Sequence, residues 1–127
     1  MESTGPRAGL PAATAELGRA GEDAALDTYR RRGFELVARN WRCPLGELDL
    51  VLRRDRLLVF CEVKTRRGTA LGPPYEAVHV AKQRKLRSLA KAFLSIRGCA
   101  DSVRFDVASV IVRAGARPQV HLFEDAF

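Results

Sequence analysis

Hydrophobic and polar residues follow two different periods along this chain, one typical of helices and the other typical of strands. Between residues 86 and 93 the apolar side chains recur at positions i, i+3, i+4 and i+7, which is the spacing of one helix face. Elsewhere apolar and polar residues alternate with a period of two, and Gly and Pro residues separate the segments. The pattern predicts helices over residues 15–32 and 75–97, and strands over residues 34–42, 46–54, 57–65, 103–112 and 119–123.

The first predicted helix has recognisable signals at both ends. Thr14 is expected to be its N-cap, with Glu16 in a first turn where negative charge is favourable, and Gly33 follows its end as a C′ residue. The preceding residues 1–13 contain Pro and Gly and have no apolar run, so we expect a flexible tail there and no signal peptide. Residues 14–127 are then expected to form a single domain.

The strands before the long helix are predicted to pair with one another. Alternation puts Leu48 and Leu50 on one face of the second strand and Asp49 on the other, and a turn at Asp55 joins this strand to the next as an antiparallel hairpin. Residues 66–74 read as a loop, and the long helix after it is expected to return the chain parallel to the third strand. The sequence therefore predicts an α/β fold with a mixed five-stranded sheet flanked by helices, in the order α-β-β-β-α-β-β.

The chain is strongly basic. Its 22 Lys and Arg residues exceed its 15 Asp and Glu residues, which gives a net charge of +7 and a pI near 10.0, and most of the basic residues are Arg. The planar fork of Arg matches phosphate oxygens, which favours nucleic acid as a partner, although charge that serves solubility alone is the alternative. No apolar run approaches the roughly 20 residues of a membrane span. Separate cysteines with no CxxC pair favour a reducing, cytoplasmic setting without a zinc ribbon.

Two predicted strands carry charged residues where apolar residues would be expected. Asp49 lies between two leucines, while Glu62 and Lys64 follow an apolar run and share one face of the next strand. An antiparallel hairpin brings Asp49 opposite Glu62. Two carboxylates can hold Mg²⁺ or Mn²⁺, which acidifies a bound water and neutralises a phosphate, and the ammonium group can stabilise the transition state. The alternative is a cross-strand salt bridge between Lys64 and either carboxylate.

Two segments of the chain resemble the core motif of the PD-(D/E)xK nucleases, namely Gly46-Glu47-Leu48-Asp49 and Phe60-Cys61-Glu62-Val63-Lys64-Thr65-Arg66. Residues 17–127 as a whole resemble the bacterial YraN family of that restriction-endonuclease-like (Holliday-junction-resolvase-like) superfamily. Further matching pieces are Gly21-Glu22, Asn40-Trp41-Arg42 and Lys82-Gln83. The resemblance implies a restriction-endonuclease-like fold. It also implies that Asp49, Glu62 and the backbone carbonyl of Val63 bind metal, and that Lys64 is the catalytic lysine.

Helical geometry adds side chains from both helices to this site. Lys82 and Gln83 lie on the face that continues into the core, so they are expected to point toward the sheet. Similar nucleases use a Gln or Lys there to assist catalysis; the alternative is that both only extend past the core edge. Glu22 shares its face with small residues that permit close packing on the sheet, so it is expected to reach the metal, with a solvated helix glutamate as the alternative. Glu47 lies with Asp49, either as a third ligand or as a charge neighbour.

A basic surface is predicted beside this site. The second helix carries no acidic residue from position 82 onward, and two arginines follow the site strand. Phosphate contacts position a duplex without reading its sequence, so we expect these side chains to contact DNA, with an ordinary solvated face as the alternative. The expected contacts are Arg66, Arg67, Lys82, Arg84, Lys85, Arg87 and Lys91.

These observations favour a metal-dependent nuclease that hydrolyses phosphodiester bonds, in structured or branched DNA rather than RNA. Two other classes stay open: a non-catalytic nucleic-acid-binding module that keeps the nuclease fold, and a protein-interaction subunit. The predicted single domain leaves no second domain for reading sequence, which argues against a sequence-specific restriction enzyme. A homodimer is compatible with these features, since a symmetric pair of sites can cut both strands of a duplex.

Overall fold

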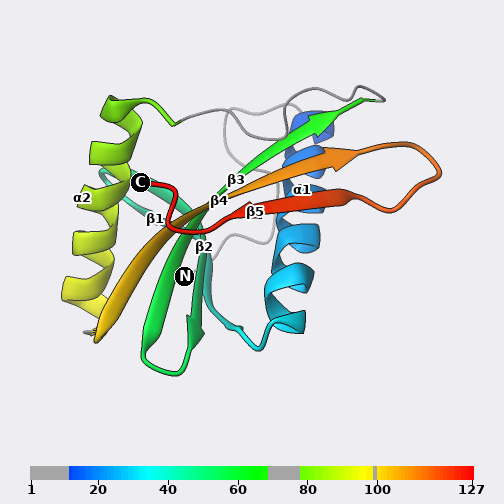
Figure 1. Ribbon diagram of the computed structural model, residues 1–127. Helices are drawn as coiled ribbons and strands as arrows, with labels where there is room; N and C mark the ends of the chain where they lie inside the picture. The colour runs from blue at the N-terminus through cyan, green and yellow to red at the C-terminus, as the bar shows by residue number, and fades with distance from the viewer. Residues whose placement is uncertain (1–11, 69–77, 99) are drawn as a thin grey trace.

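The computed structural model describes residues 12–68, 78–98 and 100–127, which form a five-stranded sheet with helices on both faces (Figure 1). The elements are α1 (Ala12–Arg31), β1 (Glu35–Cys43), β2 (Gly46–Arg54), β3 (Leu57–Arg67), α2 (Val80–Arg97), β4 (Ser102–Val112) and β5 (Gln119–Phe123). The α/β class, the mixed sheet and the order α-β-β-β-α-β-β confirm the prediction. Most of the expected tail over residues 1–13 lies outside the described residues. Neither described helix combines the length and apolar character of a membrane span.

The strands of the sheet follow the order of the chain, β1-β2-β3-β4-β5. β3 and β4 pair in parallel along their whole length, because α2 carries the chain back between them. The other neighbouring strands pair antiparallel. α1 covers one face of the sheet and α2 covers the other, so each helix defines one apolar layer (Figure 1).

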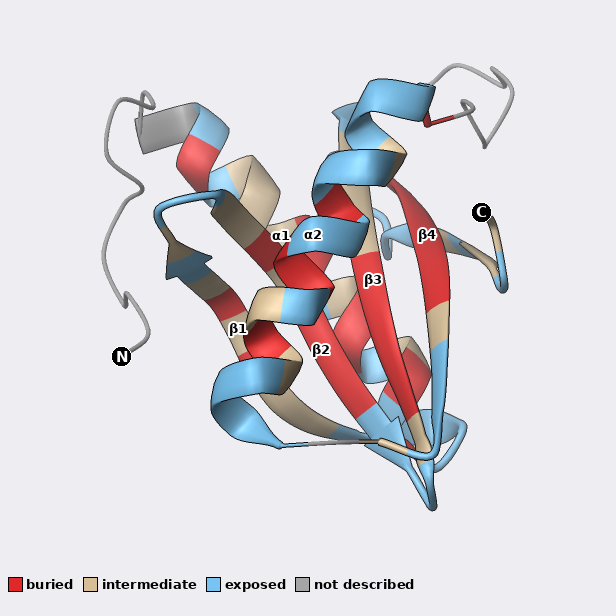
Figure 2. Ribbon diagram, turned by 90° about the vertical axis from the view of Figure 1, so that its left-hand side faces the viewer, coloured by how far each residue is buried: buried red, intermediate tan, exposed pale blue. Residues whose placement is uncertain are grey.

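Each of these two layers buries the apolar stripe of one helix, and burial is densest on the central strands (Figure 2). On the α2 side, Leu86, Leu89 and Phe93 pack against the sheet, as their helical spacing predicts. On the α1 side, Leu26 and Tyr29 pack against apolar residues of the same strands. Because the central strands are covered on both faces, they contain nearly continuous apolar runs.

α1 ends as the sequence predicts, but it begins earlier. Gly33 has a φ of +88°, and its N–H donates to the carbonyl of Arg30 at 3.0 Å, while the N–H of Phe34 donates to the carbonyl of Tyr29 at 3.1 Å. These two bonds form a Schellman motif, which the Phe34 ring completes by packing edge-on against Tyr29 with ring centroids 5.3 Å apart. The predicted N-cap is wrong. Thr14 lies inside the helix, because the alanines at 12 and 13 favour helix and extend it backwards.

Two further boundaries differ from the prediction. α2 begins at Val80, since His79 adopts the extended conformation of an N-cap with φ −61° and ψ 150°, and residues 75–77 of the predicted helix lie outside the described residues. β3 continues past Thr65, because its parallel ladder with β4 extends through Arg67. Arg66 and Arg67 therefore lie on a strand rather than in the predicted loop.

Along β1 and β2, a simple alternation of side chains between the two faces of the sheet does not hold. A bulge after Leu36 and a positive φ of +52° at Asn40 change which side chains of β1 face each helix. In β2, Leu48 packs in the α2 layer and Leu50 packs in the α1 layer, so the prediction that they share a face is wrong. Asp49 lies at this change of face, between the two layers.

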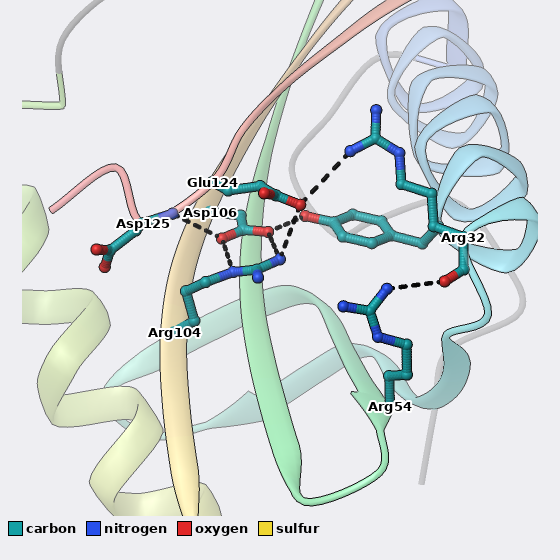
Figure 3. A network of polar contacts seen from close by, with 7 residues as sticks. Arg32, Arg54, Arg104, Asp106, Glu124 and Asp125 are labelled. Atoms are coloured by element: carbon teal, nitrogen blue, oxygen red, sulfur yellow. Dashed lines mark hydrogen bonds and ion pairs between the residues drawn. The ribbon is translucent and has the colours of Figure 1, made fainter.

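A buried carboxylate ties α1, β4 and the C-terminal segment together (Figure 3). Asp106 has no exposed surface, and Arg104 donates to both of its oxygens at 2.8 and 2.9 Å. The Tyr29 hydroxyl donates to the same carboxylate at 2.6 Å, and the amide of Asp125 donates at 3.1 Å. Burial, together with neighbouring acidic groups, raises the pKa of Tyr29, so its hydroxyl remains a donor. The sequence pattern alone did not identify this network.

Replacing Asp106 with Ala is expected to lower the free energy of unfolding by about 3–5 kcal/mol. The change leaves the buried hydroxyl of Tyr29 without its acceptor, and it leaves the part-buried side chain of Arg104 with only its longer contact to Glu124 at 3.3 Å. Urea denaturation followed by circular dichroism measures the loss. Asp101→Ala is the matched control, because it removes an exposed partner of Arg56 and should cost less than about 1 kcal/mol. Equal losses in the two variants would contradict this account.

Candidate functional site

The candidate site begins where β2 and β3 stop pairing. The ladder between the two strands runs from the hairpin turn as far as Leu50 and Cys61. Beyond that point the side chain of Asp49 takes the place of a backbone partner, and its Oδ2 accepts the N–H of Val63 at 2.8 Å. This bond gives an acceptor to an amide that has no backbone partner on β2, and it fixes the orientation of the carboxylate.

Asp49 lines a cavity of about 390 Å³ between the sheet and α2. The cavity combines carboxylates from the strands with ammonium groups and leucines from the helix. Glu62 lines it too, so the prediction that the hairpin brings Asp49 and Glu62 to the same side is confirmed. The residues around the cavity are Glu47, Asp49, Glu62, Val63, Lys82, Lys85, Leu86 and Leu89.

Three carboxylates come close enough to share one metal ion. Oxygen atoms of Glu22, Glu47 and Asp49 all lie within 4.8 Å of one another. Glu22 belongs to α1 and is only 2% exposed. The helix can approach this closely because Gly21 faces Thr65 of β3, where an added Cβ would lie 1.8 Å from the Thr65 Oγ1. The structure thus brings Glu22 to Asp49, as the small residues on its helix face predict.

Asn40 holds two of these carboxylates in position. Its Nδ2 donates to the Oε2 of Glu22 at 3.0 Å and to the Oε2 of Glu47 at 2.8 Å, so both amide hydrogens are used. The residue is 8% exposed, and its positive φ is a conformation that Asn tolerates better than most residues. Arg39 also donates to Glu22 at 3.3 Å, and Arg42 donates to Glu47 at 3.2 Å. Sequence reasoning assigned Asn40 no role; a polar residue inside an alternating strand was the available signal.

The electrostatics of the cluster favour a bound cation. The pKa of Asp49 is raised well above its usual value, first by burial and then by the charge of Glu62, while the hydrogen bond from Val63 opposes the shift. Negative charge is therefore concentrated where water stabilises it poorly. Carboxylate oxygens are the hard ligands that Mg²⁺ and Mn²⁺ prefer, so this donor set fits the expected metal.

Lys82 forms an ion pair inside the cavity. Its Nζ lies 3.2 Å from the Oε2 of Glu62, so this helix lysine points toward the sheet as predicted. The alternative drawn from the sequence was a salt bridge between Lys64 and Asp49 or Glu62, whereas the lysine that pairs with Glu62 in the structure is Lys82 of α2. Lys85 packs over Gly46, where an added Cβ would lie 3.0 Å from the lysine Cε. Lys64 is half-buried on β3, two residues beyond Glu62, and its catalytic role stays a prediction.

The other predicted residues occupy different surroundings. Gln83 donates from Nε2 to the carbonyl of Val78 at 2.8 Å, which anchors the start of α2 outside the cavity lining, and its part in catalysis stays a prediction. The guanidinium of Arg87, which is exposed, lies 4.8 Å from the centroid of the Phe105 ring in a cation–π contact, and its role in binding phosphate stays a prediction. The remaining predicted contacts are exposed: Arg66, Arg67, Arg84 and Lys91.

Comparison with known sequences adds a family match. The family described as "Uncharacterised protein family UPF0102" matches residues 21–110. A UPF0102 protein of Nocardia farcinica is 45% identical over 112 residues, which cover 87% of this chain and 88% of the relative. A UPF0102 protein of Syntrophotalea carbinolica is 48% identical over 113 residues, covering 87% and 90%. A UPF0102 protein of Acidothermus cellulolyticus is 40% identical over 131 residues, covering 94% and 99%.

Asp49→Asn is expected to stabilise the metal-free protein at neutral pH. A carboxyl group with a raised folded-state pKa holds its proton more tightly when folded, so its ionisation destabilises the fold as the pH rises above 3.8, the ordinary pKa of Asp. Asn keeps an acceptor for the Val63 amide but cannot ionise. Urea denaturation in EDTA should show the variant more stable by about 1–3 kcal/mol at pH 7, with a difference that shrinks as the pH falls toward about 4.

Asp55→Asn serves as the control for this measurement, because it changes an exposed turn residue whose φ of +55° suits Asn. Adding Mn²⁺ should raise the melting temperature of the wild type more than that of Asp49→Asn, since a ligand stabilises the form that binds it. A difference in unfolding free energy that does not depend on pH would argue against a raised pKa at Asp49. Equal shifts in melting temperature on adding Mn²⁺ would argue against a metal site there.

Proposed function

Since this chain belongs to the uncharacterised protein family UPF0102, which is the YraN group, its activity must follow from its own side chains, and we propose that it is a metal-dependent nuclease. The proposed reaction is hydrolysis of phosphodiester bonds in structured or branched DNA. The observation that carries the proposal is the meeting of Glu22, Glu47 and Asp49 beside a cavity that also contains ammonium groups. Phosphodiester hydrolysis requires both, one to hold a cation and the other to stabilise an anion.

The three clustered carboxylates would hold the metal, with Glu22 contributed by α1 and Glu47 and Asp49 by β2. When bound, Mg²⁺ or Mn²⁺ supplies an acidified water and neutralises charge on the scissile phosphate. Asn40 acts as the positioning residue, because it donates one hydrogen to each glutamate and fixes the direction of their oxygens. The motif resemblance adds Glu62 as a further proposed ligand from the same cavity.

The lysines would bind and stabilise the substrate phosphate. Lys82 and Lys85 line the cavity from α2, on the opposite side from the strand carboxylates. The ammonium group of Lys82 pairs with Glu62, and its flexible stem lets it shift to a phosphate oxygen when substrate enters. Lys64 is the proposed group that stabilises the negative charge of the transition state, since it follows Glu62 on β3.

The choice of DNA as substrate rests on the charge around the cavity. The chain carries a net charge of +7, and α2 has basic residues on both its cavity-facing and its exposed sides. Arg84 and Lys91 are exposed on this helix, where they can contact phosphates beyond the cleaved one. Arg87, which stacks on Phe105, is a third proposed backbone contact of α2.

A second candidate function is a nucleic-acid-binding module without turnover. The observation that favours it is the Lys82–Glu62 ion pair at 3.2 Å, which neutralises one of the carboxylates expected to bind metal. In that case the basic surface would bind DNA with an affinity that metal does not change. The two functions therefore differ in a measurable property, the effect of Mg²⁺ on binding and cleavage.

Asp49→Asn is expected to abolish Mg²⁺-dependent cleavage of branched DNA while the protein stays folded. Lys64→Ala should slow cleavage by about 10²–10³-fold, the scale of losing one preorganised electrostatic group, and Lys64→Arg should not restore it. Single-turnover rates on labelled flap, branched, single-stranded and duplex DNA measure the effect. Lys91→Ala, an exposed lysine of α2, is the matched control and should retain the chemical rate at saturating enzyme.

Other results in that assay would overturn parts of the proposal. Cleavage that persists in Asp49→Asn would exclude this site as the source of the activity. A larger loss in Lys82→Ala than in Lys64→Ala would move the catalytic lysine to α2. A wild type that binds DNA equally with and without Mg²⁺ and cleaves none of the substrates would support the binding module.

Salt dependence tests the basic surface separately. Replacing Arg84 and Lys91 with Ala should flatten the slope of log affinity against log salt by about two units, because each lost phosphate contact removes about one. Arg87→Ala should flatten the slope by about one further unit, because a guanidinium stacked on Phe105 keeps its in-plane N–H donors for a phosphate. Fluorescence anisotropy in EDTA is a suitable measurement. Arg30→Ala with Arg53→Ala is the charge-matched control on other surfaces, and an equal effect there would indicate nonspecific attraction.

A further inference from the structure

Arg42, near the end of β1, forms an ion pair with one carboxylate of the candidate metal site. Its Nε lies 3.2 Å from the Oε1 of Glu47, which is its directly opposite partner in the ladder between β1 and β2. The other oxygen of Glu47 accepts a hydrogen bond from Asn40 at 2.8 Å. Glu47 also lines the cavity of about 390 Å³, so the Arg42 guanidinium lies at the border of that cavity.

A second pair of this kind lies on the other side of Asp49. Glu62 of β3 pairs with the Nζ of Lys82 at 3.2 Å, and β2, which carries Asp49, lies between β1 and β3 in the sheet. Two carboxylate–cation pairs therefore flank Asp49, one between β1 and β2 and the other between β3 and α2. The chain's own side chains supply positive charge to carboxylates that are suited to hold a metal.

The Arg42–Glu47 pair is weakly held. The side chain of Arg42 is 39% exposed, and Glu47 is its one side-chain partner within the part of the chain that the structure describes. An ion pair with this exposure contributes little stability, because water screens it and both side chains must be ordered to form it. Arg42 can therefore leave Glu47 without disturbing the fold.

Arg39 of the same strand provides the contrast. It pairs with Glu22 at 3.3 Å, but it also pairs with Asp23 at 2.7 Å and donates to the carbonyl of Arg19 at 3.1 Å. Its side chain is 21% exposed. These three acceptors all belong to α1, so Arg39 joins the helix to the sheet and is fixed in place. Of the two arginines, Arg42 is the one that can exchange its partner.

We propose that Arg42 is a substrate-binding residue that exchanges Glu47 for a phosphate of the DNA once Glu47 holds a metal ion, an inference that rests on the proposed function. A divalent cation on Glu47 repels the guanidinium that shares this carboxylate, so the ion pair weakens. The planar fork of Arg42 then suits a phosphate oxygen, with Lys82 as its counterpart on the other side of Asp49. Metal binding therefore precedes tight DNA binding at this site.

Titration calorimetry of the full chain with Mn²⁺ tests the competition for Glu47. Arg42→Ala is expected to bind Mn²⁺ about three- to fivefold more tightly, because no ion pair has to open. An arginine that only orients Glu47 would give the opposite result, a weaker affinity. Arg56→Ala is the matched control. It removes an arginine of the hairpin turn, at the opposite end of β2 from Glu47, whose pair with Asp101 has the same length of 3.2 Å, and it should leave the affinity unchanged.

DNA binding provides a second readout. In EDTA, Arg42→Ala should bind labelled branched DNA as wild type does, because Glu47 holds Arg42 there. With Mn²⁺, the variant should bind about tenfold more weakly than wild type, the effect of losing one charge-assisted contact. Arg42→Lys should keep the wild-type affinity for Mn²⁺ but lose part of the DNA affinity, since an ammonium group pairs with Glu47 and lacks the fork. Stopped-flow anisotropy measures binding before cleavage proceeds.

Weaker Mn²⁺ binding by Arg42→Ala would overturn the exchange and make Arg42 a positioning residue for Glu47. Equal losses of DNA affinity with and without Mn²⁺ would overturn it as well, and would assign Arg42 to the general basic surface. A wild type that cleaves DNA, with an Arg42→Ala variant that matches it in every measurement, would refute this inference and leave the nuclease standing. The expected pattern in a protein that cleaves nothing would support the exchange and refute the nuclease. A wild type that binds no Mn²⁺ would refute both.

Discussion

The hydrogen bond from the Val63 amide to the Asp49 carboxylate is the interaction on which the candidate site depends. It forms because β2 and β3 stop pairing after Leu50 and Cys61, which leaves an amide for a side chain to satisfy. The carboxylate that takes this role lies between the two apolar layers, where α1 can deliver Glu22 and α2 can enclose a cavity. A regular hairpin would pair the amide with backbone, and the carboxylate would have no fixed position.

Two buried aspartates show how differently one residue type can be used. Asp106 has its charge met by the two donors of Arg104 and by Tyr29, so it joins three parts of the chain. Asp49 instead lies beside Glu22 and Glu62, whose charges oppose its ionisation. The first arrangement serves the fold. The second makes ionisation of Asp49 unfavourable, a cost that a bound cation would offset, which is the pattern expected of a functional site.

Periodicity predicts the regular parts of this fold well, and it fails where backbone geometry departs from ideal. The spacing of Leu86, Leu89 and Phe93 and the hairpin at Asp55 identify elements, because many side chains act together there. The exchange of faces along β2 at Asp49, like the bulge and the positive φ of Asn40 on β1, is a departure from regular geometry that no alternation encodes. The resemblance to nuclease motifs selects Asp49 and Glu62, and one of its further pieces contains Asn40, but the role of Asn40 requires coordinates. That role arises from contacts with Glu22 and Glu47, which lie on other elements.

The parallel pairing of β3 and β4 has a consequence for the order in which the chain folds. The antiparallel hairpins from β1 to β3 join neighbours in sequence, so their contacts close short loops. β3 and β4 meet only after α2 has crossed between them, a non-local step of the kind that slows folding. The wall that α2 contributes to the cavity belongs to that late step. A nascent chain would therefore have its acidic strands before the lysines of α2 are in place, so the positively charged wall of the cavity would form only in the closing stage of folding.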